Sequence, residues 1–98
     1  MSVMPNVQVI WDLEDDPQGN VRHVAENDVP AEEVEEVLEN HFNEAVVSAS
    51  SGNPITFGWT STGKYLAVVF EKVQAHPPTA YPITAYPANP PRKKRRKK

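Results

Sequence analysis

An unbroken apolar run near the middle of the chain, from Lys64 to Glu71, limits the possible folds most strongly. Between its charged ends the run reads Tyr-Leu-Ala-Val-Val-Phe, so both alternating sets of side chains are apolar. Side chains of a strand point alternately to its two faces, and a strand that is apolar on both is typical of a sheet interior covered on both sides. Thr62-Gly63 gives a turn signal just before the run. We therefore expect a central strand around which the rest of the chain packs.

Length and composition restrict the class of protein. The chain has 98 residues and no cysteine, which is enough for one domain and leaves no disulfide or thiolate chemistry. No apolar stretch approaches the roughly 20 residues that span a bilayer, and the first residues lack the pattern of a secretion signal. We expect a soluble, cytoplasmic protein with no membrane contact.

The charge is divided between two parts of the chain. Seven of the ten basic residues form the last seven positions, while residues 1–91 carry three basic and 13 acidic residues, a formal charge of −10. A block of like charges repels itself and stays disordered. We therefore expect a folded domain over residues 1–87 and a proline-rich stalk with a disordered basic tail over residues 88–98. The tail either binds nucleic acid or lies on the acidic surface of its own domain, and the sequence leaves both open.

Two helices are expected ahead of the central strand. The first follows Asp16-Pro17, which combines a carboxylate cap with a proline suited to the first helical position. The second spans residues 31–40, where Val34, Val37 and Leu38 recur with helical spacing. Most other positions of the second helix are glutamates, so its outer surface is expected to be strongly acidic.

Further strands are expected at residues 7–11, 44–48, 55–59 and 81–87. The first and third alternate apolar and polar residues, and their tryptophans, Trp11 and Trp59, are expected in the core. Prolines bracket residues 81–87, which favours a short or edge strand, and residues 74–79 are expected to form a loop. One strand, two helices and then a run of strands predict an α+β domain.

Six short segments spread over residues 7–87 form an ordered set. They are Trp11-Asp12, Gly19-Asn20-x-x-His23, Val29-Pro30-x-Glu32-Glu33-Val34, Phe57-Gly58-Trp59-Thr60, Gly63-Lys64-Tyr65-x-Ala67-Val68-Val69 and Tyr81-Pro82-Ile83-Thr84-Ala85-Tyr86. In this order they resemble the BrnT-like toxins, which belong to the RelE/ParE-like group. The resemblance implies a RelE-like α+β fold, with two N-terminal helices packed on a small, mainly antiparallel sheet.

The resemblance also implies a function. Members of the family are toxins of bacterial type II toxin–antitoxin pairs, which cleave RNA and are neutralised by a partner protein. RNA and a cognate antitoxin are therefore the expected partners, with no small-molecule cofactor. The better-known members carry arginine where this chain has Tyr81 and Tyr86, and their bodies are basic. The chain thus looks like a divergent branch of the family.

RNA cleavage by a 2′-hydroxyl needs a base, an acid and cations for the charge that develops on the phosphate. Within this framework we expect His23, Lys64 and Tyr86 to be catalytic. Histidine is the side chain most often used for acid–base catalysis, which suits His23 to proton transfer; Tyr86 carries a transferable proton, and Lys64 is suited to a phosphate contact. Each also has a structural interpretation: His23 packs or caps the first helix, Tyr86 lies in a core or hairpin, and Lys64 is solvated at a strand end.

The expected RNA-binding residues are mostly basic. They are Arg22, Tyr81, Arg92, Lys93, Lys94, Arg95, Arg96, Lys97 and Lys98. Tyr81 either stacks on a base or packs as an ordinary aromatic. The three histidines lack ligand-like spacing, and the acidic cluster at residues 12–16 lacks the glycine of a calcium loop, so no metal site is expected.

Two functions therefore remain open. The first is an RNA-cleaving toxin neutralised by an antitoxin. The second is a non-catalytic member of the same fold that binds RNA or a protein through its acidic helix and basic tail.

Overall fold

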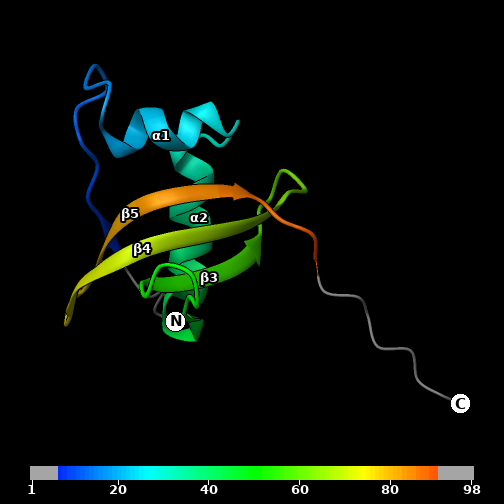
Figure 1. Cartoon of the computed structure of the whole chain (residues 1–98). Helices are drawn as coiled ribbons and strands as arrows, with labels where there is room; N and C mark the ends of the chain where they lie inside the picture. The colour runs from blue at the N-terminus through cyan, green and yellow to red at the C-terminus, as the bar shows by residue number, and fades with distance from the viewer. Residues whose placement is uncertain (1–6, 91–98) are drawn as a thin grey trace, which may run out of the picture.

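The computed structural model describes residues 7–90 as a five-stranded mixed sheet with both α-helices on one face (Figure 1). The elements in chain order are β1 (Gln8–Val9), α1 (Asn20–Glu26), α2 (Ala31–His41), the 3₁₀ helix η1 (Phe42–Glu44), β2 (Val46–Val47), β3 (Pro54–Trp59), β4 (Tyr65–Ala75) and β5 (Pro78–Pro87). The strand order is β1-β5-β4-β3-β2, with β1 parallel to β5 and the other pairs antiparallel. The predicted α+β class and the order of one strand, two helices and then strands are confirmed. Because β1 comes first, the helices are not strictly N-terminal, as the resemblance had implied.

β4 is the central strand that the apolar run predicted. It lies third of five, between β3 and β5. Leu66, Val68 and Phe70 point toward the helices and are at most 1% exposed. The strand is longer than expected, because it continues to Ala75 as a hairpin with β5.

Helix α2 supplies most of the core on this face, and Figure 1 shows it crossing behind β3, β4 and β5. Its predicted apolar positions, Val34, Val37 and Leu38, are all fully buried. The close approach of α2 to β3 depends on Gly58. A Cβ at that position would lie 2.4 Å from the ring of His41, the last residue of α2, which is closer than real Cβ contacts allow.

Helix α1 begins later than predicted. The residues after Asp16-Pro17 form a turn, in which the Gly19 N–H donates to the Asp16 carbonyl, and the helix starts at Asn20. Asn20 is almost fully buried, and its side chain donates to the carbonyls of Ile10 and Pro82. The side chain of Asn20 thus fixes the start of α1 against the sheet.

β5 corrects two expectations. It is neither short nor at an edge, since it runs from Pro78 to Pro87 between β1 and β4. Residues 74–79, expected as a loop, are largely the paired ends of β4 and β5. Pro82 is tolerated in this inner strand because its backbone faces away from β4. Its carbonyl accepts from Asn20, and in an extended residue the nitrogen points to the same side as the carbonyl, so no N–H is missing from the pairing with β4. The register of β4 and β5 also shifts next to Phe70, the partner of Pro82.

Candidate nucleic-acid interface

The face of the sheet opposite the helices carries a cluster of aromatic side chains. Phe57 and Trp59 come from β3, Tyr65 from β4 and Tyr86 from β5. Strand geometry gathers them, because cross-strand partners share a face: Trp59 is opposite Tyr65, and Ala67 is opposite both Phe57 and Tyr86. We call these four residues the aromatic face.

Three of the four rings form a contiguous group. The rings of Phe57 and Tyr65 are stacked, with centroids 6.1 Å apart and planes 12° apart. The rings of Trp59 and Tyr65 are 5.1 Å apart and tilted by 57°. Trp59 is nevertheless 56% exposed, and Phe57 and Tyr86 are each 39% exposed. Exposed aromatic rings in a connected patch mark a surface suited to binding.

This arrangement corrects one prediction. Trp59 was expected in the core and instead lies at the surface, whereas Trp11 does pack against the core. The second face of β4 was also expected to be covered. Ala67 and Val69 are indeed buried, but both helices lie on the opposite face. The small side chains of β4 on this face are shielded from water by larger side chains of the neighbouring strands β3 and β5.

The chain leaves the sheet beside the aromatic face. Just after β5 ends, the Ala88 N–H donates to the Tyr65 carbonyl at 2.9 Å. The basic residues begin at Arg92, four positions later, so a fully extended chain would separate them from Ala88 by at most about 14 Å. The tail residues Arg92 to Lys98 lie outside the described residues.

The cations of the body lie elsewhere. Lys64 is on the helix side, where its Nζ is 3.2 Å from Glu33 Oε1 and 3.1 Å from the Asp28 carbonyl. Glu33 Oε1 accepts no hydrogen bond, so this ion pair is what compensates its burial. Lys72 lies 5.4 Å from the centre of the Phe42 ring, also on the helix side. Arg22 is exposed on α1.

The predicted catalytic residues occupy three different parts of the molecule. His23 is exposed on α1, Lys64 is paired with Glu33 on the helix side, and Tyr86 is on the aromatic face. Lys64 and Tyr86 thus lie on opposite sides of the sheet. The fold does not gather a base, an acid and a cation from this set.

Tyr81 has a structural partner. Its hydroxyl donates to Asp12 Oδ2 at 2.6 Å. This hydrogen bond lowers the pKa of the Asp12 carboxyl and raises the pKa of the Tyr81 hydroxyl. Asp12 also exchanges two hydrogen bonds with Asn20, one from each backbone N–H. Tyr81 therefore joins β5 to the start of α1, a role that the sequence did not reveal.

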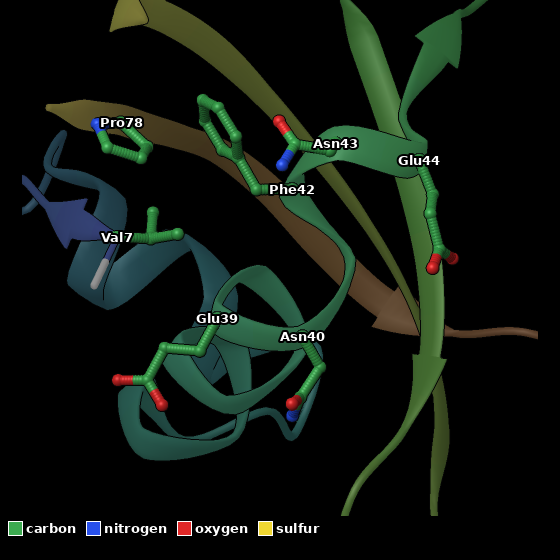
Figure 2. Close-up of a pocket in the computed structure, with 7 residues that line it drawn as sticks. All are labelled: Val7, Glu39, Asn40, Phe42, Asn43, Glu44 and Pro78. Carbon is green, nitrogen blue, oxygen red and sulfur yellow. The ribbon is translucent and has the colours of Figure 1, made fainter. Parts of the chain in front are cut away.

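Two pockets lie on either side of η1, away from the aromatic face. Figure 2 shows one of about 210 Å³, with the apolar side chains of Val7, Phe42 and Pro78 at one end and Glu39 and Asn40 at the other. The second, of about 250 Å³, lies between η1, β2 and β4. Neither contains a predicted site residue.

The structure of residues 7–90 also bears on metal binding and on membrane crossing. No group of three or more His, Cys, Asp or Glu side chains there is arranged to hold a metal ion. No helix in the same range is long and apolar enough to cross a membrane.

Phe57, Trp59 and Tyr65 were missed as functional candidates. Their common face was visible in the alternation of the sequence, and two helices are enough to cover one face of a small sheet. Taken together, these two facts would have indicated an open face.

No family model matches the chain, and comparisons with curated proteins and with solved structures find no match either.

Proposed function

We propose that this protein binds single-stranded RNA, with unpaired bases on the aromatic face and phosphates on the basic tail. The observation that carries the proposal is the cluster of exposed Phe57 and Trp59 around the half-buried Tyr65, next to the point where the chain leaves the sheet toward the tail.

The aromatic face supplies stacking energy. A base stacked on an aromatic side chain contributes roughly 1–3 kcal/mol, and every base offers a ring face, so such binding tolerates sequence variation. Bases in a duplex are already stacked on one another, whereas those of single strands are free to splay onto a protein. The preferred ligand is therefore unpaired RNA.

The tail supplies attraction. The body carries a formal charge of −10 and repels a polyanion, whereas the tail carries seven positive charges. Neutralising seven phosphates of a single strand gives a slope of about −5 in log affinity against log salt. RNA binding should accordingly be strong at low salt and weak at high salt.

Fluorescence anisotropy with a labelled single-stranded 12-nucleotide RNA tests the stacking part. Trp59→Ala should weaken binding about tenfold, within the range expected for one stacked base. Leu13→Ala is the matched control, because Leu13 is 76% exposed and is not part of the aromatic face. Equal affinity of the two variants would rule out stacking on Trp59.

Deleting residues 92–98 tests the charge part. At low salt the truncated protein should bind the same RNA much more weakly than the full chain. The slope of its log affinity against log salt concentration should also become shallow. Unchanged binding would remove the tail from the proposal while leaving the aromatic face to be judged by the Trp59 variant.

The resemblance to BrnT-like toxins suggests the setting in which RNA would be bound. We propose a RelE-like fold and a cytoplasmic toxin of a type II toxin–antitoxin pair, with an antitoxin as second partner. One observation favours this likeness: Asp12, Asn20 and Tyr81, from three of the resembling segments, form a single hydrogen-bonded network. Residues far apart in the sequence thus act as one structural unit.

RNA cleavage is the catalytic form of this proposal, with His23, Lys64 and Tyr86 as its residues. The separation of Lys64 from Tyr86 favours binding without cleavage. A growth assay decides between the two forms. Cleavage requires that the induced wild-type protein arrests growth and degrades RNA, and that His23→Ala and Tyr86→Phe relieve the arrest. If the wild type neither slows growth nor degrades RNA, the catalytic form is wrong.

A further inference from the structure

The outer edge of β2 is an open sheet edge. β2 is the last strand in the order β1-β5-β4-β3-β2. Its two residues are strongly exposed, Val46 by 62% and Val47 by 71%. An apolar edge strand of this kind is a template for pairing with another strand.

The backbone of Val47 is directed away from β3. In an antiparallel pair, hydrogen-bonded and non-hydrogen-bonded residue pairs alternate. Val47 is opposite Pro54, which has no N–H, and the next pair is bonded, with the Ser48 N–H donating to the Asn53 carbonyl at 2.8 Å. The N–H and C=O of Val47 therefore face the open edge.

The edge also lacks electrostatic protection. Residues 45–63 contain no charged side chain, although residues 1–91 carry a formal charge of −10. Edge strands are commonly blunted by short length, lysine, proline or a bulge. β2 is only two residues long, but residues 45–49, Ala-Val-Val-Ser-Ala, contain neither lysine nor proline. Because residues 1–91 are strongly acidic, two copies repel each other over most of their surface. The uncharged segment at residues 45–63 is where this repulsion is weakest.

We propose that β2 pairs with β2 of a second copy of this chain across a two-fold axis at Val47. In this antiparallel register Val47 is opposite its own counterpart and Val46 is opposite Ser48. Each Val47 N–H donates to the other Val47 carbonyl. The small side chain of Ser48 permits the close approach that a strand pair needs.

The dimer would place two aromatic faces within reach of one RNA strand. Only this consequence rests on the proposed function; the dimer itself does not. A two-fold axis perpendicular to the sheet keeps both aromatic faces on the same side. One RNA strand can then contact the β3 aromatics of both copies in succession. The dimer itself is tested without RNA, so its failure and the failure of RNA binding are separate results.

Sedimentation equilibrium on the full chain measures the association. The wild type should show a monomer–dimer equilibrium with a dissociation constant below about 1 mM. Val47→Lys and Val47→Glu each place like charges directly opposite across the axis, which should raise the dissociation constant about fivefold or more. An equimolar mixture of the two variants should dimerise again, because Lys then faces Glu.

Leu13→Lys is the control for added charge, since Leu13 is equally exposed but distant in sequence from the edge, and it should leave dimerisation intact. Circular dichroism checks that each variant is folded. A wild type that remains monomeric up to about 1 mM overturns the proposal. So does a mixture of folded Val47→Lys and Val47→Glu that fails to associate, because the register requires their mutual contact.

Discussion

The two faces of the sheet are both apolar, but they are covered in different ways. On the helix side Leu66, Val68 and Phe70 are at most 1% exposed beneath the helices. On the aromatic face the small residues Ala67 and Val69 are buried among side chains of the same sheet, while Phe57, Trp59 and Tyr86 remain 39–56% exposed. An apolar pattern therefore indicates that a strand is screened from water, without indicating which part of the chain screens it.

The largest effect of a substitution is expected in the helix-side core. Phe70→Ala should lower the free energy of unfolding by about 3–5 kcal/mol, because it leaves a cavity in a packed region. Phe70 is 1% exposed, and its ring lies 5.5 Å from that of Phe42. Phe57→Ala on the aromatic face is the comparison, with an expected loss of about 1 kcal/mol. Urea unfolding measures both, and equal losses would contradict the contrast between the faces.

The buried hydrogen-bond network should be the next most sensitive. Asn20→Ala should cost about 2–3 kcal/mol, because it leaves the carbonyls of Ile10 and Pro82 without their donor. Asn40→Ala is the matched control, since Asn40 is exposed and bonds only within its own helix. A loss at Asn20 no greater than that at Asn40 would show that α1 is held in place by other contacts.

The two tryptophans separate stability from binding. Trp11 packs against the core and donates to Glu35 Oε2 at 2.8 Å, so Trp11→Ala should cost about 2 kcal/mol of stability. Trp59→Ala should cost less than about 1 kcal/mol and should account for the loss of RNA affinity. Unfolding curves and anisotropy on the two variants provide the test. If both variants lost stability and affinity in the same proportion, the two faces would not have distinct roles.

The smallest effect concerns pH. The folded state holds the pKa of Asp12 below its unfolded value, so its contribution to stability is present above about pH 4 and is lost as the pH falls further. The raised pKa of Tyr81 acts in the opposite direction: its contribution is complete below about pH 10 and is lost above it. Tyr81→Phe should therefore destabilise most at neutral pH, with a difference from wild type that shrinks at both extremes. A pH-independent difference in urea unfolding would contradict this assignment.

Much of the fold followed from local pattern. The apolar run placed β4 in the middle of the sheet, and helical spacing identified the buried positions Val34, Val37 and Leu38. Patterns of this kind depend only on side-chain periodicity, which the sequence displays directly.

The parts that were missed depend on contacts between distant residues. Proline suggested an edge strand at β5, but the Pro82 carbonyl is bound by Asn20, 62 positions away. Alternation put Trp59 and Phe57 on one face without saying that the helices would cover the other. Lys64 and Tyr86 appeared compatible with one site, yet the register of β4 and β5 and the ion pair with Glu33 assign them to opposite sides.

The burial of Ala67 beneath exposed rings has a consequence for evolution and for motion. The aromatic side chains that would contact a ligand also cover the central strand. A substitution that improves contact with a ligand therefore risks exposing β4 to water. Conversely, a molecule bound across those rings would shield β4 further from solvent. Amide protons in the middle of β4 would then exchange more slowly, although the ligand makes no direct contact with them.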